Sequence, residues 1–177
     1  MTGPIRRQLD LLLSAYGYNL YDKKNRERAD DLVVRNQSAA ALGDAADALR
    51  QLRTSYAQRF IPAATRDNPF PPAERMAALK EIERLQTRLA DLAARIRAVP
   101  VPPSDKVWMR FRKERQTLED LLLHDYNLIQ PATELRDLVR GLQPDDWSTE
   151  RAGDLDQRAT GIEQALRERA DFLASAG

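Results

Sequence analysis

Residues 73–99 read AERMAALKEIERLQTRLADLAARIRAV, and the rest of the fold can be worked out from this segment. Two prolines precede it and Pro100 follows it, so a helix here is bounded on both sides. Within it, apolar residues recur at alternating spacings of three and four, the a/d pattern of a coiled-coil seam. These residues are Ile82, Leu85, Leu89, Leu92, Ile96 and Val99. We therefore predict a helix over 72–98 whose seam needs a partner, from the same chain or from a second copy.

Four further helices are predicted from apolar stripes and from the prolines, glycines and capping residues between them. Their approximate ranges are 4–20, 22–60, 104–142 and 148–174. Pro131 lies inside the helix over 104–142 and is expected to kink it, because proline has no N–H to donate. Residues 38–48 are mostly alanine with one glycine, which lets another helix approach closely.

The connections between these helices indicate how they pack. Residues 61–72 contain four prolines and cannot be helical, and Phe70 in this loop is expected to tuck into the end of the bundle. Short connections make consecutive helices antiparallel. The predicted fold class is therefore all-α: a single domain over 1–177, forming an elongated antiparallel (up-down) bundle of four to five helices with coiled-coil-like seams.

Composition limits the function without identifying it. The 28 basic residues are almost balanced by 27 acidic ones, so binding to a polyanion would need a local patch. The chain has no cysteine, which excludes disulfides and thiolate metal sites and suits the cytoplasm. No apolar run approaches the length of about 18 residues that a membrane helix needs, so no membrane partner is expected. The abundance of arginine and alanine favours a GC-rich bacterial genome as its cause.

The segment 106–115 is the best candidate for a nucleic-acid or anion-binding surface. Its cations surround Trp108 and Phe111, and they are Lys106, Arg110, Arg112, Lys113 and Arg115. On a helix, Lys106, Arg110 and Lys113 would share one face, along which a phosphate backbone could lie. The simpler interpretation is a solvated cationic face that acidic residues on neighbouring helices offset.

A second basic and aromatic group lies near the start of the helix over 22–60. Its members are Tyr18, Tyr21, Lys23, Lys24, Arg26 and Arg28. Rings that stack on bases, mixed with cations, suit single-stranded nucleic acid. Because aromatic residues of helical proteins usually belong to the core, we favour the interpretation in which these tyrosines pack at a helix junction.

Asp120, His124, Asp125 and Tyr126 form the group that could serve an enzyme or a small ligand. Asp120 and His124 are one helical turn apart and could pair. Asp125 shares its heptad position with Phe111, Leu118, Ala132 and Val139. Its carboxylate therefore falls on the apolar side, where it needs an arginine or tyrosine from another helix. We interpret Asp125 as a polar lock for helix register.

No catalytic residue, metal site or cofactor is predicted, because the chain has one histidine and no second cluster of ligands at metal spacing. These observations favour a non-enzymatic helical scaffold or adaptor that acts through protein–protein contacts and self-associates, with a homodimer as the simplest form. A nucleic-acid-binding bundle that uses Lys106 to Arg115 is the alternative. A ligand or enzyme site near Asp125 and Tyr126 is the second alternative.

Overall fold

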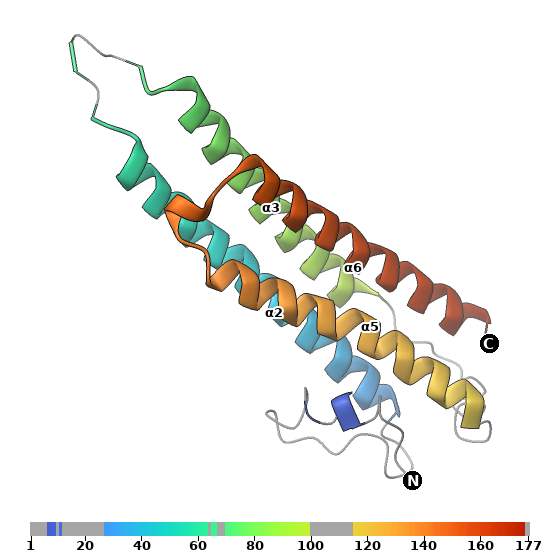
Figure 1. Cartoon of the computed structure of the whole chain (residues 1–177). Helices are drawn as coiled ribbons and strands as arrows, with labels where there is room; N and C mark the ends of the chain where they lie inside the picture. Colours follow the sequence, from blue (N-terminus) through green and yellow to red (C-terminus); the bar gives the residue numbers. More distant parts are fainter. Residues whose placement is uncertain are drawn as a thin grey trace.

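Two helical hairpins lie side by side in the computed structural model of the chain (Figure 1). The structure describes residues 7–9, 11, 27–63, 65–66, 70–99 and 115–175. The first hairpin consists of α2 (Glu27–Phe60) and α3 (Ala73–Ala98). The second consists of α5 (Arg115–Arg140), the short 3-10 helix η1 (Pro144–Asp146) and α6 (Thr149–Ser175). The described residues contain no strand, and the expected all-α bundle is confirmed.

The helix boundaries lie close to the prolines and capping residues of the sequence. Helix α3 begins directly after Pro72, within one residue of the predicted start. Helix α6 begins after Ser148, whose Oγ accepts a hydrogen bond from the N–H of Arg151 at 3.1 Å and so caps the helix. Helix α5 continues through Pro131 without interruption. The carbonyl that Pro131 cannot reach belongs to the exposed Asn127, so water can replace the missing donor.

Some predicted elements lie partly outside the described residues. Of the helix expected over 4–20, the structure describes residues 7–9 and 11, all of them helical. The segments 22–26 and 104–114, which belong to the starts of two predicted helices, are also outside the described residues. Among the helices that are described, none is both long enough and apolar enough to cross a membrane.

Neighbouring helices of the two hairpins run in the same direction. Helix α2 packs against α3 and α5, and α6 packs against α5 and α3. Both hairpin turns lie at the same end of the bundle, so α2 runs parallel to α5 and α3 runs parallel to α6 (Figure 1). Helix direction alternates along the chain, as expected of up-down connectivity. The lateral pairs are nevertheless a mixture, with antiparallel packing inside each hairpin and parallel packing between hairpins.

One apolar core runs along the heptad positions of all four helices. The seam residues of α3, Ile82 to Ile96, are at most 1% exposed. The same cluster contains Leu42 and Leu49 of α2, Leu135 of α5 and Ile162 of α6. Alanines 39, 41, 45 and 46 of α2 are buried as well, in agreement with the close approach predicted there. The seam of α3 is therefore satisfied within a single chain.

The turn between α2 and α3 projects beyond the turn of the second hairpin (Figure 1). Phe70 in this turn is 81% exposed, so the expectation that it tucks into the bundle is wrong. The end of the hairpin is already filled by Tyr56 and Phe60, whose ring centroids are 4.7 Å apart. Arg75 covers them, because its guanidinium lies 4.5 Å from the Phe60 ring and donates a hydrogen bond to the Tyr56 hydroxyl at 3.1 Å.

Candidate functional site

Four charged side chains form a layer inside the core, at the end of the bundle away from the hairpin turns. They are Asp31 and Arg35 of α2, Asp125 of α5 and Arg169 of α6, and each is at most 3% exposed. Three of them continue heptad rows of apolar core residues, and Asp31 precedes the buried Ser38 by seven residues. Arg35 precedes Leu42 by seven residues, and Arg169 follows Ile162 by seven. We call this group the ionic layer, since it replaces apolar side chains in the seams.

Arg169 is at the centre of the ionic layer. Its Nε donates a hydrogen bond to Asp125 Oδ1 at 2.7 Å, and its Nη2 donates one to Asp31 Oδ1 at 2.7 Å. Burial by itself would lower the pKa of Arg169, but the charges and hydrogen bonds of the two carboxylates raise that pKa above its ordinary value. Because its partners lie on α5 and α2, this one side chain joins three helices.

Arg35 extends the ionic layer to the fourth helix. Its Nε donates a hydrogen bond to Asp31 Oδ2 at 3.0 Å, and its Nη1 donates one to the carbonyl oxygen of Val99 at the end of α3. Its Nη2 lies 2.7 Å from Asp31 Oδ2 as an ion pair without hydrogen-bond geometry. Two arginines and two aspartates give the layer no net charge. Paired and hydrogen-bonded in this way, buried charges are tolerated inside a protein.

The expected burial of Asp125 and its arginine partner on another helix are confirmed. Asp31, Arg35 and Arg169 are not predicted from the sequence above. A single charged residue beside an apolar stripe usually lies at the boundary with solvent, so the sequence position of such a residue does not indicate burial. The signal that could have found these residues is the seven-residue spacing to the core, combined with opposite charges on different helices.

The other members of the proposed acid–base group have separate surroundings. Asp120 Oδ1 accepts a hydrogen bond from Gln116 Nε2 at 3.1 Å, whereas the His124 ring lies on Phe172 of α6 with centroids 4.8 Å apart. Among the described contacts these two residues are not paired with each other. Tyr126 packs against a small apolar cluster between α2 and α5. In the described part of the chain, no histidine and carboxylate groups are arranged to hold a metal ion.

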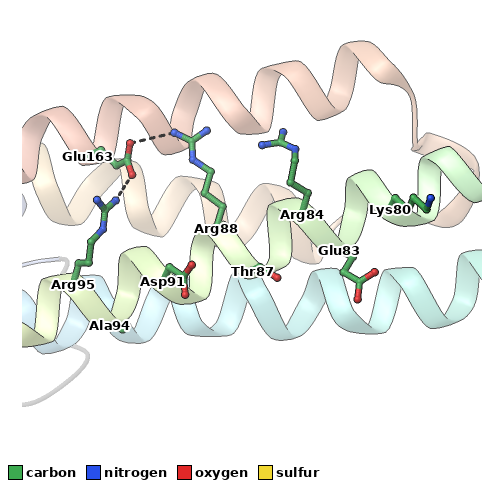
Figure 2. A pocket seen from close by; sticks show the side chains of 9 residues that line it. All are labelled: Lys80, Glu83, Arg84, Thr87, Arg88, Asp91, Ala94, Arg95 and Glu163. Carbon is green, nitrogen blue, oxygen red and sulfur yellow. Dashed lines mark hydrogen bonds and ion pairs between the residues drawn. The ribbon is translucent and has the colours of Figure 1, made fainter.

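A second polar group lies on the surface, in an open groove that is lined by α3 and by Glu163 of α6 (Figure 2). Arg84 pairs with Asp156 at 2.9 Å, and Arg88 reaches both Asp156 and Glu163. Arg95 also pairs with Glu163, so that two arginines share this carboxylate. The flanking positions of the α3 seam thus carry interhelical ion pairs, the usual place for them on packed helices.

These pairs change how the carboxylates titrate. Burial alone would raise the pKa of Asp156, but hydrogen bonds from Arg88 and Arg84 lower it below its ordinary value of 3.8. Burial also acts to raise the pKa of Glu163, but hydrogen bonds from Arg95 and Arg88 outweigh this effect. The pKa of Glu163 is therefore lowered below its ordinary value of 4.5. The arginines of the groove are therefore already neutralised by carboxylates of the same chain, which makes this groove a poor site for an external anion.

The basic groups proposed from the sequence are mostly outside the described residues. This applies to Lys106, Trp108, Arg110, Arg112 and Lys113, and to Tyr18, Tyr21, Lys23, Lys24 and Arg26. Arg28 and Arg115 are described as backbone positions in the first turns of α2 and α5. Because α2 and α5 are parallel neighbours, both basic segments join the described structure at the same end of the bundle (Figure 1).

Comparisons of the chain with models of protein families, with curated proteins and with solved structures found no match. The site is therefore interpreted from its own geometry.

Proposed function

We propose that this chain is a non-enzymatic helical adaptor that binds a protein partner through the exposed residues 70–73, which we call the hairpin tip. The observation that carries this proposal is the 81% exposure of Phe70. The next three residues, Pro71, Pro72 and Ala73, are exposed as well. An aromatic residue in such a run loses contact with water most favourably by entering a partner's pocket, and aromatic residues are enriched at the centres of protein interfaces.

Side-chain contacts hold the end of the hairpin directly below the hairpin tip, which supports a role in recognition. Tyr56, Phe60 and Arg75 pack together directly below it. Arg59 pairs with Asp145 at 2.7 Å and so links the end of α2 to the turn of the second hairpin. Binding residues are commonly carried on loops that a rigid scaffold positions.

The ionic layer supports a structural role for Asp125 in preference to a ligand or enzyme site. The Asp125 carboxylate is 0% exposed, and Arg169 holds it at 2.7 Å. A general acid or a ligand-binding carboxylate has to meet a substrate, whereas this one meets an arginine inside the core. The same interactions unite the four helices, as an adaptor that holds a fixed shape requires.

Site-specific photo-crosslinking tests the adaptor proposal. A photoreactive amino acid is placed at position 70 in the full chain, with exposed Gln157 on α6 as the matched control position. We expect one discrete protein adduct from position 70 that position 157 does not give. Once the partner is purified, Phe70→Asp should weaken its binding at least about tenfold, near 1.4 kcal/mol, while Phe70→Trp retains it. Identical adducts from both positions would contradict the proposal.

Nucleic-acid binding is the second candidate, because the two basic segments join the starts of α2 and α5, which are neighbouring helices. Their combined charge would give an affinity that falls steeply as salt concentration rises. Fluorescence anisotropy with labelled single- and double-stranded oligonucleotides tests this, using the double variant Arg110→Glu and Lys113→Glu. Salt-dependent binding that disappears in the variant would support this candidate, and no binding at low salt would remove it.

We further propose that the protein works in the cytoplasm, which its lack of cysteine suits, and that it self-associates. The seam of α3 is buried within one chain, so self-association has to use another surface.

A further inference from the structure

The backbone of the hairpin tip is extended where it meets α3. Pro72 has φ −56° and ψ 130°, close to the polyproline II values of about −75° and +145°. The ring of Pro71 fixes its φ in the same region. A residue that precedes a proline is kept out of the helical region, and this applies to both Phe70 and Pro71. Residues 70–72 therefore favour one turn of polyproline II helix, which has three residues per turn.

This turn is exposed along its length and held at one end. The side chains of Phe70, Pro71 and Pro72 are all exposed. The carbonyl oxygen of Pro72 accepts hydrogen bonds from the N–H groups of Arg75 and Met76, both at 3.1 Å, in the first turn of α3. Helix α3 therefore holds the end of the turn in place, while its three side chains can contact a partner.

The two prolines limit the kinds of partner that this turn suits. Proline has no N–H, so Pro71 and Pro72 donate no backbone hydrogen bond, and the turn is unsuited to extend a partner's sheet as an added strand. The extended backbone at Pro72 also does not suit a groove that binds helices. The common mode that remains is a groove lined by aromatic side chains, on which the rings of a polyproline II segment pack.

We infer that the partner of the hairpin tip carries an aromatic-lined groove that binds residues 70–72 as a polyproline II turn. This inference rests on the proposed adaptor function and specifies the class of its partner. Pro71 and Pro72 pack on the aromatic side chains of the groove, and the Phe70 ring enters an adjacent apolar pocket. Because the φ angles of both prolines are fixed by their rings before binding, the turn loses little conformational entropy when it binds.

A binding panel tests the inference. The labelled full chain is applied to a panel of immobilised Src-homology-3 and WW domains, whose grooves are of this kind. We expect domains of the panel to bind the wild type, with a dissociation constant at least about tenfold higher for the double variant Pro71→Ala and Pro72→Ala. The matched control is Pro62→Ala, which removes an exposed proline from the same connection outside the hairpin tip. It should change the dissociation constant less than about twofold.

The outcomes separate this inference from the adaptor proposal. Binding to no domain of the panel, or equal binding by the wild type and the double proline variant, would overturn the inference. A discrete photo-crosslinked adduct from position 70 would then leave the adaptor role standing, with a partner pocket of another kind. Circular dichroism checks that the double variant stays folded, as we expect because both prolines are exposed and precede α3. If it does not, the single variant Pro71→Ala, one residue further from α3, gives the same test.

Discussion

The guanidinium of Arg169 lies between Asp31 and Asp125. Removing it would lower the free energy of unfolding, because both carboxylates would stay buried without this partner. Both carboxylates are at most 3% exposed, so water cannot replace the lost hydrogen bonds. An ion pair inside a protein adds little over well-packed apolar residues, but a single unpaired buried charge is strongly unfavourable. Loss of the Arg169 side chain should therefore be strongly destabilising, because two buried carboxylates share it.

We expect Arg169→Met to lower the free energy of unfolding by about 3–5 kcal/mol, because two buried carboxylates lose a partner. Urea denaturation followed by circular dichroism measures the change. The matched control is Arg167→Met, two residues earlier on the exposed face of α6, which should change stability by at most about 0.5 kcal/mol. Equal effects of the two substitutions would show that the ionic layer does not stabilise the core in this way.

At the scale of the helix, the ionic layer specifies which helices meet and in what register. Apolar heptad seams are similar along their length, so a helix that slips by one heptad still buries leucine against leucine. The ionic layer removes that freedom, because Arg169 finds Asp31 and Asp125 at only one level of the bundle. We therefore predict that the layer excludes alternative packings more than it increases the stability of the native one.

Replacing the whole ionic layer should have a different effect from breaking it. We expect the fourfold variant Asp31→Leu, Arg35→Met, Asp125→Leu and Arg169→Met to be at least as stable as the wild type, by up to about 4 kcal/mol. Its amide NMR spectrum should be broadened by exchange among registers. A fourfold variant less stable than Arg169→Met alone would contradict this account.

The ion pairs between α3 and α6 give the bundle an acid sensitivity with a definite sign. The pKa values of Asp156 and Glu163 are lowered in the folded protein from 3.8 and 4.5, so the unfolded chain binds more protons in acid. The stabilisation is fully present above these values and is lost as the pH falls below them. We expect the urea midpoint to decrease as the pH falls below about 5.

Arg88→Met is the informative variant for this prediction, because Arg88 contacts both carboxylates. Its urea midpoint should depend less on pH than that of the wild type. A high salt concentration should reduce the difference between the two proteins, since these groups are partly exposed and their attraction is screened. An unchanged pH dependence in Arg88→Met would assign the acid sensitivity to other carboxylates.

At the scale of the whole molecule, the surface that we propose for recognition and the core that stabilises the fold are in different places. We expect Phe70→Asp to change the free energy of unfolding by at most about 0.5 kcal/mol, because the ring is 81% exposed. Leu85→Ala, in the core of α3, should cost about 2–5 kcal/mol. Thermal and urea unfolding measure both. A large destabilisation by Phe70→Asp would mean that the hairpin tip supports the fold.

The helices of this molecule could be predicted from the sequence more completely than their arrangement. Prolines and heptad spacing define α3 to within a residue, and the register of Asp125 predicts its burial and a partner that is arginine or tyrosine, of which the structure has the arginine. The parallel pairing of α2 with α5 does not follow, because connection lengths fix the directions of consecutive helices and not their lateral neighbours. The exposure of Phe70 could not be predicted either, since it depends on how Tyr56, Phe60 and Arg75 fill the end of the hairpin.

The hairpin tip and the end of α6 lie at opposite ends of the bundle (Figure 1). The helices between them therefore set a fixed distance between these two sites. Helix α2 has 34 residues, which at 1.5 Å each sets a length of about 51 Å. A partner held at the hairpin tip and a second molecule held near Ser175 would be kept apart by roughly this length. Dyes attached at positions 70 and 175 should therefore report one narrow distance by energy transfer, and a partner that bends the bundle would shorten it.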